Sequence, residues 1–121
     1  MSLKAVACTF AILAAAIAAS HQAAAETWSG AYGATIMSTY TDGRTAKVYV
    51  EPDHTYSVVL PNGTILKGTW ADSDGQSCFT LDESAPGAKP TCFPAKEYKV
   101  GDSFNGEDSS GKFTGVIQAG R

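Results

Sequence analysis

The stretch from Ala46 to Trp70, AKVYVEPDHTYSVVLPNGTILKGTW, decides the fold of this chain. Apolar and polar residues alternate in three short runs, and a proline-containing break separates each run from the next. Alternation with a period of two is typical of strands that bury one face. The stretch therefore predicts three consecutive antiparallel strands joined by tight hairpin turns.

Both breaks have the composition of a three-residue hairpin loop. In LPNGT, Pro occupies the first corner of a type I turn and Gly the left-handed position that follows, which pairs Leu60 with Thr64. EPDHT repeats this arrangement with His54 at the left-handed position, a conformation that His tolerates better than most residues. This second loop pairs Glu51 with Thr55.

This register separates the side chains into two faces. One face collects Ala46, Val48, Val50, Tyr56, Val58, Leu60, Thr64, Leu66, Gly68 and Trp70, and the other collects Lys47, Tyr49, Ser57, Val59, Ile65, Lys67 and Thr69. The first face is nearly all apolar and the second is mixed. A two-residue Asn-Gly turn would shift the pairing by one residue and place Lys67 beside Val58. The three-residue loop is therefore favoured.

The same alternation continues on both sides of this stretch. Turns are predicted at 41–44 and at Asp74-Gly75, and further inward positions are Trp28, Gly30, Tyr32, Ala34, Ile36, Phe79, Leu81, Phe113, Gly115 and Ile117. About seven strands result, and no amphipathic helix. The predicted fold is all-β, a small antiparallel up-and-down meander that curls into a partly closed barrel, because nothing else in the chain can cover its apolar face.

Residues 1–25 are predicted to be a helical, cleaved signal peptide. A short positive segment ends at Lys4, and Ala5–Ala19 is apolar but shorter than the roughly 20 residues that span a bilayer. The small residues before Glu26 predict cleavage between Ala25 and Glu26, with cleavage after Ser20 as the alternative. Residues 26–121 would then form a single periplasmic or secreted β domain with no integral membrane anchor.

Cleavage changes the composition that bears on function. Loss of Lys4 leaves eight basic and twelve acidic side chains, a net charge of −4, which argues against nucleic acid as a partner. The mature chain keeps two cysteines, Cys78 and Cys92, and an even pair in an exported chain predicts one disulfide. The alternative, a metal site, lacks the four ligands that zinc requires, so no metal or cofactor is expected.

The polar candidates for catalysis each have a simpler interpretation. His54, the one mature histidine, fits a turn, and no nucleophile is paired with it in the sequence. The segment 72–75 resembles the start of a calcium loop but lacks the closing ligands, so a hairpin turn is favoured. The acidic pairs 82–83 and 107–108 fit solvated turns, because neighbouring strand residues point to opposite faces. We therefore expect no catalytic residue.

Two further groups could contact a partner or ligand. The aromatic residues on the predicted inner face could line a cavity, although filling the interior is the simpler account: Trp28, Tyr32, Tyr56 and Trp70. The loop 85–90, APGAKP, lies between the two cysteines, and its predicted disulfide would hold it as an exposed contact element.

Short motifs give the chain a resemblance to known proteins. They are WSGAY at 28–32, TYS at 55–57, KGTW at 67–70, DGQSCF at 74–79 and CF at 92–93. In this order they resemble a group of small exported β proteins of alphaproteobacteria, of sphingomonad type, with no assigned activity. A fainter similarity is to the periplasmic metalloprotease inhibitors of lipocalin-like fold, which insert an N-terminal segment into the protease. Cleavage after Ala25 would leave too short a segment, and cleavage after Ser20 would restore one.

The expected function is therefore that of an exported, non-enzymatic binding or envelope-associated module, whose partner could be a periplasmic protein. The alternatives are a periplasmic protease inhibitor and a small-molecule carrier. The partner, the ligand and the oligomeric state have no signal in the sequence.

Overall fold

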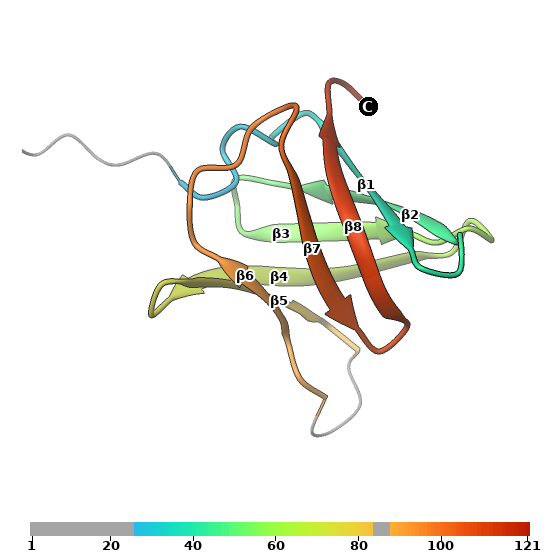
Figure 1. The fold of residues 1–121 in the computed structure, drawn as a ribbon. Coiled ribbons are helices and arrows are strands. Elements are labelled where there is room, and N and C mark those ends of the chain that lie inside the picture. The colour runs from blue at the N-terminus through green and yellow to red at the C-terminus, as the bar shows by residue number, and fades with distance from the viewer. Residues whose placement is uncertain (1–25, 84–87) are drawn as a thin grey trace, which may run out of the picture.

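The computed structural model describes residues 26–83 and 88–121, and the predicted signal-peptide helix lies outside them. Within these ranges the secondary structure is β only (Figure 1). The eight strands are β1 (Thr35–Tyr40), β2 (Thr45–Val50), β3 (Thr55–Val59), β4 (Ile65–Ser73), β5 (Gln76–Leu81), β6 (Thr91–Pro94), β7 (Ser103–Asp108) and β8 (Gly111–Gln118). The predicted all-β class is confirmed, with one strand more than the seven expected.

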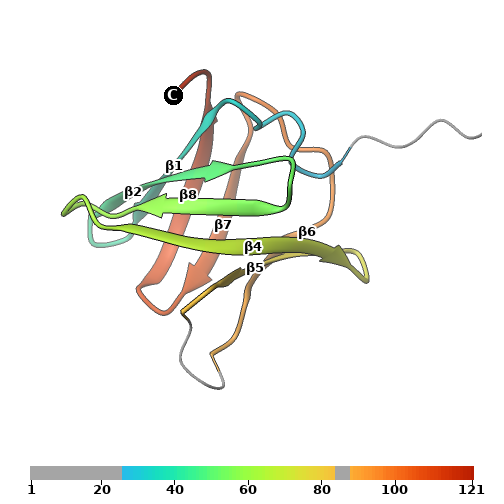
Figure 2. The ribbon, with the colours of Figure 1, turned by 180° about the vertical axis from the view of Figure 1, so that it is seen from behind.

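The strands form one antiparallel sheet in the order β6-β5-β4-β3-β2-β1-β8-β7. Each strand pairs with its neighbour in sequence except β6 and β7, and β8 returns to pair with β1. The sheet curls so that β3 and β4 lie across from β7 and β8 (Figures 1 and 2). The sheet forms a nearly closed barrel, which agrees with the partly closed barrel predicted. Its two edge strands, β6 and β7, do not pair with each other.

The register predicted for 46–70 is confirmed. Val50 lies opposite Tyr56, and Val58 opposite Leu66. The left-handed positions of the two three-residue loops are occupied by His54, with a φ of 69°, and by Gly63, with a φ of 87°. The shorter turn between β4 and β5 has two successive left-handed residues, as expected for an Asp-Gly type I′ hairpin.

The strand predicted to begin at Trp28 is wrong over its first half. Residues 27–34 form successive turns, Gly33 adopts a φ of 77°, and β1 begins only at Thr35. The alternating pattern misled because Trp28 and Ala34 are buried for another reason: this capping segment, residues 26–34, folds over one end of the barrel. Gly30 touches Lys99 there through an isolated parallel bridge.

The barrel interior is filled by interlocking aromatic rings. The described core consists of Trp28, Ala31, Ala34, Ile36, Val50, Tyr56, Trp70, Phe79, Phe93, Tyr98, Phe113 and Ile117. Inward glycines make room for some of these rings on the neighbouring strand. Tyr56 lies opposite Gly68, where an added Cβ would come within 2.7 Å of the Tyr56 ring. Large and small side chains therefore alternate around the wall.

Candidate functional site

Trp28 is the centre of the capped end of the barrel and is wholly buried. Its ring stacks on Tyr98, with centroids 4.3 Å apart, and it meets Phe79 edge-on at 5.3 Å. Its indole N–H donates a 2.8 Å hydrogen bond to Ser77 Oγ, which is also fully buried. The only polar atom of the Trp28 side chain is therefore satisfied, and the residue acts as a plug rather than as a ligand platform.

The other aromatic residues predicted to face inward divide into two groups. Tyr56 and Trp70 are buried in the core, 7% and 2% exposed. Tyr32 is half-buried at the capped end, where it packs against the core and its hydroxyl reaches Glu26. Trp28, Tyr56 and Trp70 are therefore core residues, the reading that the sequence favoured, whereas Tyr32 is partly buried against the core.

The predicted disulfide is present and joins Cys78 to Cys92. The two cysteines lie directly opposite each other on β5 and β6, between positions that face the interior. The bond therefore ties the four-residue edge strand β6, and with it the buried ring of Phe93, to the rest of the sheet. A disulfide indicates an oxidising setting outside the cytoplasm.

His54 lies at the rim of the capped end, in the left-handed position predicted for it. Its ring stacks on Trp70, with centroids 4.0 Å apart, and its Nε2 lies 3.0 Å from Glu26 Oε2. The hydroxyl of Tyr32 donates to the same oxygen at 3.2 Å. Burial, and then the Glu26 carboxylate, raise the pKa of Tyr32 to about 12, so this hydroxyl keeps its proton at neutral pH.

This group lacks the parts of a catalytic triad. In a triad, a histidine contacts a nucleophile on one side and an orienting carboxylate on the other. Here Glu26 and the Trp70 ring account for the contacts of His54, and no hydroxyl or thiol of the described residues bonds to its ring. The group holds the capping segment against the barrel.

The segment 72–75 is a hairpin turn, as the sequence favoured over a calcium loop. The carboxylate of Asp72 accepts a hydrogen bond from the hydroxyl of Thr27 and so also holds the capping segment. Across residues 26–83 and 88–121, no three His, Cys, Asp or Glu side chains cluster in a way that could hold a metal ion.

The two acidic pairs lie near the open end of the barrel, opposite the capping segment. Asp108 accepts a 2.6 Å hydrogen bond from the Tyr40 hydroxyl. Burial, and then this hydrogen bond, raise the pKa of Tyr40. Burial, followed by the charges of Asp82 and Asp108, raises the pKa of Tyr56 to about 12. One carboxylate from each pair thus acts on a common tyrosine, whereas Glu83 and Glu107 are exposed.

The outside of the sheet carries two hollows. One is a polar groove of about 360 Å³ over β3 and β4, lined by Glu51, Thr55, Tyr56, Ser57, Lys67, Gly68, Thr69 and Asp82. The other, the hairpin hollow, lies where β2 begins and β3 ends and measures about 300 Å³. It is lined by Thr45, Ala46, Lys47, Val59, Leu60, Pro61 and Gly63.

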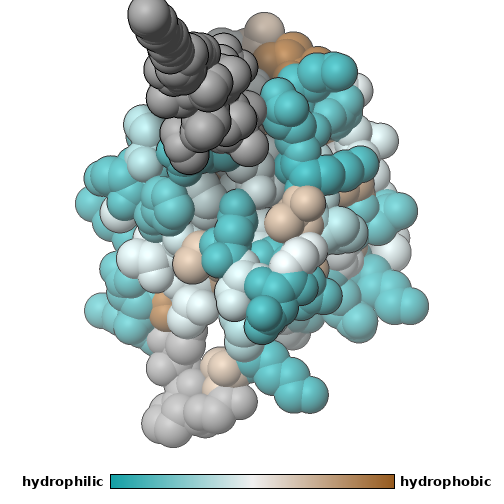
Figure 3. Space-filling model, turned by 90° about the vertical axis from the view of Figure 1, so that its left-hand side faces the viewer, coloured by the Kyte–Doolittle hydropathy of each residue, from teal (hydrophilic) through white to brown (hydrophobic). Residues whose placement is uncertain are grey.

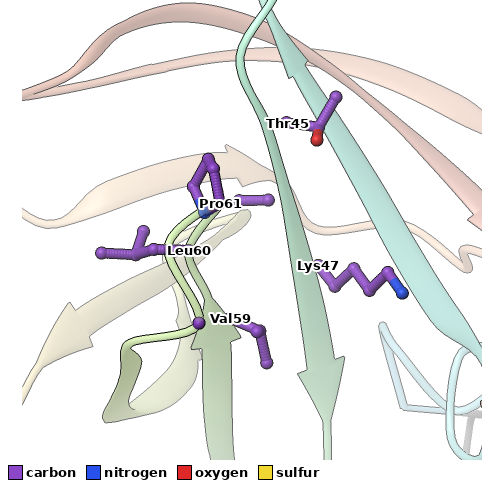
Figure 4. A pocket seen from close by; sticks show the side chains of 7 residues that line it. Thr45, Lys47, Val59, Leu60 and Pro61 are labelled. Atoms are coloured by element: carbon purple, nitrogen blue, oxygen red, sulfur yellow. The ribbon is translucent and has the colours of Figure 1, made fainter.

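The hairpin hollow has the fewer charged lining residues, Lys47 alone against Glu51, Lys67 and Asp82 in the polar groove. Val59 and Lys47 project from neighbouring strands on the same side, while Leu60 points away to the other side (Figure 4). Ile65 lies directly opposite Val59 on β4 and is 59% exposed, the highest value for a large hydrophobic residue in the described chain. Val59 and Ile65 lie on the mixed outer face, as the register predicted, and together they place two apolar side chains opposite each other on that face.

The face at which the capping segment lies is mostly hydrophilic. Hydrophilic residues cover most of it, with only scattered hydrophobic ones between them (Figure 3).

The loop predicted as a contact element lies partly outside the described residues, which omit 84–87, and Ala88, Lys89 and Pro90 are exposed. No helix in the described chain is long and apolar enough to cross a membrane. A family model, a curated protein or a solved structure that matches the chain was not found.

Proposed function

We propose that this chain is an exported, non-enzymatic module that binds a partner in the periplasm or outside the cell through the outer surface of its barrel. The observation that carries the proposal is the contrast between an aromatic-filled interior and a surface hollow beside the exposed Ile65. Exposed apolar surface on a small domain is typical of an interaction site.

The filled interior makes the carrier alternative less favourable. A carrier barrel needs a cavity that encloses its ligand. Here Trp28 contacts Phe79, Phe93, Tyr98 and Phe104 across the lumen. A ligand could enter only by displacing this cluster, which is costly because interiors are close-packed.

The disulfide supports the exported part of the proposal. The non-enzymatic part is supported by the His54 ring, which within residues 26–83 and 88–121 contacts Glu26 and Trp70 rather than a nucleophile. The resemblance to exported alphaproteobacterial proteins agrees with this reading and stays a prediction. A His-dependent activity is tested with a His54→Asn variant, since Asn also adopts left-handed backbone. Loss of an activity in that variant, with unchanged stability, would contradict the non-enzymatic assignment.

In-cell cross-linking tests the proposal. The full chain, expressed in its own host with a C-terminal tag, is treated with an amine-reactive cross-linker and purified under denaturing conditions. We expect one reproducible adduct with a different protein. Native mass spectrometry of the untreated protein provides the counter-test, because a monomer that carries a stoichiometric small molecule would instead support the carrier.

The inhibitor alternative depends on the N-terminus. Thr27 is fixed by its contact with Asp72 and by accepting a 2.9 Å hydrogen bond from the Tyr98 amide, so only residues before Thr27 could form an inhibitory arm. N-terminal sequencing of the mature protein decides this point. A start at Glu26 would leave no arm, whereas a start at His21 would leave a short one.

A further inference from the structure

We propose that the hairpin hollow, together with Ile65, is the docking site for an exposed segment of a partner protein that carries a large apolar side chain next to a carboxylate. This inference rests on the proposed function and names the site and the chemistry of its partner.

The walls of the hollow are the reason for proposing a large apolar side chain on the partner. Val59 and Pro61 contribute apolar surface, and Ile65 extends it from the next strand. A volume of about 300 Å³ lies at the lower end of the range for ligand pockets, so it suits one anchoring side chain and its neighbours rather than a second folded domain. Interfaces of this kind depend on a few buried apolar anchors.

The positive charge in the hollow is the reason for proposing a carboxylate on the partner. Lys47 is its one charged lining residue, and no acidic side chain lines it. Within the described chain no carboxylate lies within ion-pair distance of the Lys47 ammonium. Because the predicted mature protein is acidic overall, this local positive charge favours a negatively charged group on the partner.

The position of the hollow excludes other ways of binding. β2 and β3 each pair with a strand on both sides, so their backbone hydrogen-bonding groups are used within the sheet and a partner cannot add a strand there. A symmetric contact between two copies would place the hollow against itself, and its one charged lining residue, Lys47, would find no opposite charge there. The partner must therefore bind through its side chains.

The experiment uses a phage-displayed library of random octapeptides, selected on the immobilised mature barrel. We expect enrichment of peptides in which a large apolar residue lies within two positions of Asp or Glu. The best peptide is then measured by fluorescence anisotropy against two variants of the site, Ile65→Ser and Lys47→Glu. Each should weaken binding about tenfold or more, the effect expected for an interface anchor.

Matched controls lie on β8, which β1 separates from the strand β2 that carries Lys47. Val116→Ser removes another exposed apolar residue and Lys112→Glu reverses another exposed lysine, and both should leave binding within about twofold. Near-ultraviolet circular dichroism of the buried tryptophans checks that every variant is folded.

The outcomes separate this inference from the function on which it rests. Peptides that bind equally well to the site variants would overturn the docking site and leave a binding module intact. Failure to enrich any apolar-acidic peptide would overturn the docking site as well, while the in-cell adduct still tests the function. A dimer in sedimentation that is lost in Ile65→Ser would assign the hollow to a second copy and refute the proposed partner.

Discussion

The two ends of this barrel are built from the same meander but are finished in different ways. At the capped end, Trp28 of the capping segment is completely buried and its indole N–H donates a hydrogen bond to Ser77, while the Thr27 carbonyl accepts one from the Tyr98 amide. At the open end, the inward aliphatic side chains remain only partly buried: Val48, Val58, Leu66 and Leu81. Substitutions at the capped end are therefore expected to lower the free energy of unfolding more than substitutions at the opposite end.

The largest loss of stability is expected when Trp28, the plug of the capped end, is truncated. Trp28→Ala deletes a fully buried ring that contacts four other aromatic residues, and we expect a loss of about 3–5 kcal/mol in the free energy of unfolding. Leu66→Ala at the open end should cost clearly less, because Leu66 is partly exposed. Urea denaturation measures both. Equal losses would refute the proposed difference between the ends.

The disulfide supports the capped end from the side, because β6 carries Phe93 against Trp28. Replacing both Cys78 and Cys92 by Ala removes the closure of a 14-residue separation and should lower the free energy of unfolding by about 3 kcal/mol. The two partners are replaced together so that no free thiol remains. Thermal unfolding with and without reductant checks the result, since reductant should affect only the wild type.

A smaller effect is expected from the hydrogen bond inside the plug. Ser77→Ala leaves the Trp28 indole N–H buried without an acceptor, which should cost about 1–3 kcal/mol. Ser57→Ala on the outer face of β3 is the control and should have little effect. A water molecule that replaced the lost hydroxyl would reduce the cost of Ser77→Ala toward that of the control.

The two three-residue turns allow the same substitution site to be tested at each end of the barrel. His54 near the capped end and Gly63 at the opposite end occupy the same left-handed position. Val adopts this conformation poorly, so Gly63→Val should cost about 1–2 kcal/mol. His54→Gly should relieve backbone strain but lose the stacking on Trp70, and its net effect should be smaller. A loss in His54→Gly larger than that in Gly63→Val would show that His54 matters more for packing than for the turn.

The mildest test is alkaline titration. The pKa of Tyr56 is raised to about 12 from an ordinary value near 10, so the folded state favours the protonated phenol. This contribution to stability is complete below pH 10 and is lost as the pH rises toward 12. Tyrosinate absorbance should show Tyr56 ionising late, and Asp82→Asn should bring its pKa down. An unchanged titration in that variant would contradict a role for the Asp82 charge.

Local patterns accounted for much of the fold. The alternation from Ala46 to Trp70 and the chemistry of the two loops predicted the register of three strands, because a one-residue slip would have exposed the apolar face. The disulfide followed from an even number of cysteines. These features depend on neighbouring residues, which are visible in the sequence.

The capping segment could not be predicted in this way. Trp28 is buried by residues 49 and more positions later in the chain, so its alternation with Tyr32 imitated a strand. The hairpin hollow was missed for another reason. The predicted register already paired Val59 with Ile65 on the mixed face, but the 59% exposure of Ile65 depends on whether another part of the chain covers that face. A search for apolar pairs on the polar face of a predicted sheet would have found it.

The position of Trp28 also has a consequence for the order of folding. The residue is synthesised among the first of the described chain, yet its contacts come from β5, β6, the segment around Tyr98 and β7. During vectorial synthesis or export, the earlier hairpins can form while the plug still has nothing to bind. Native contacts of such long sequence separation slow folding, so Trp28, the first aromatic residue of the described chain, is expected to be among the last to reach its native contacts.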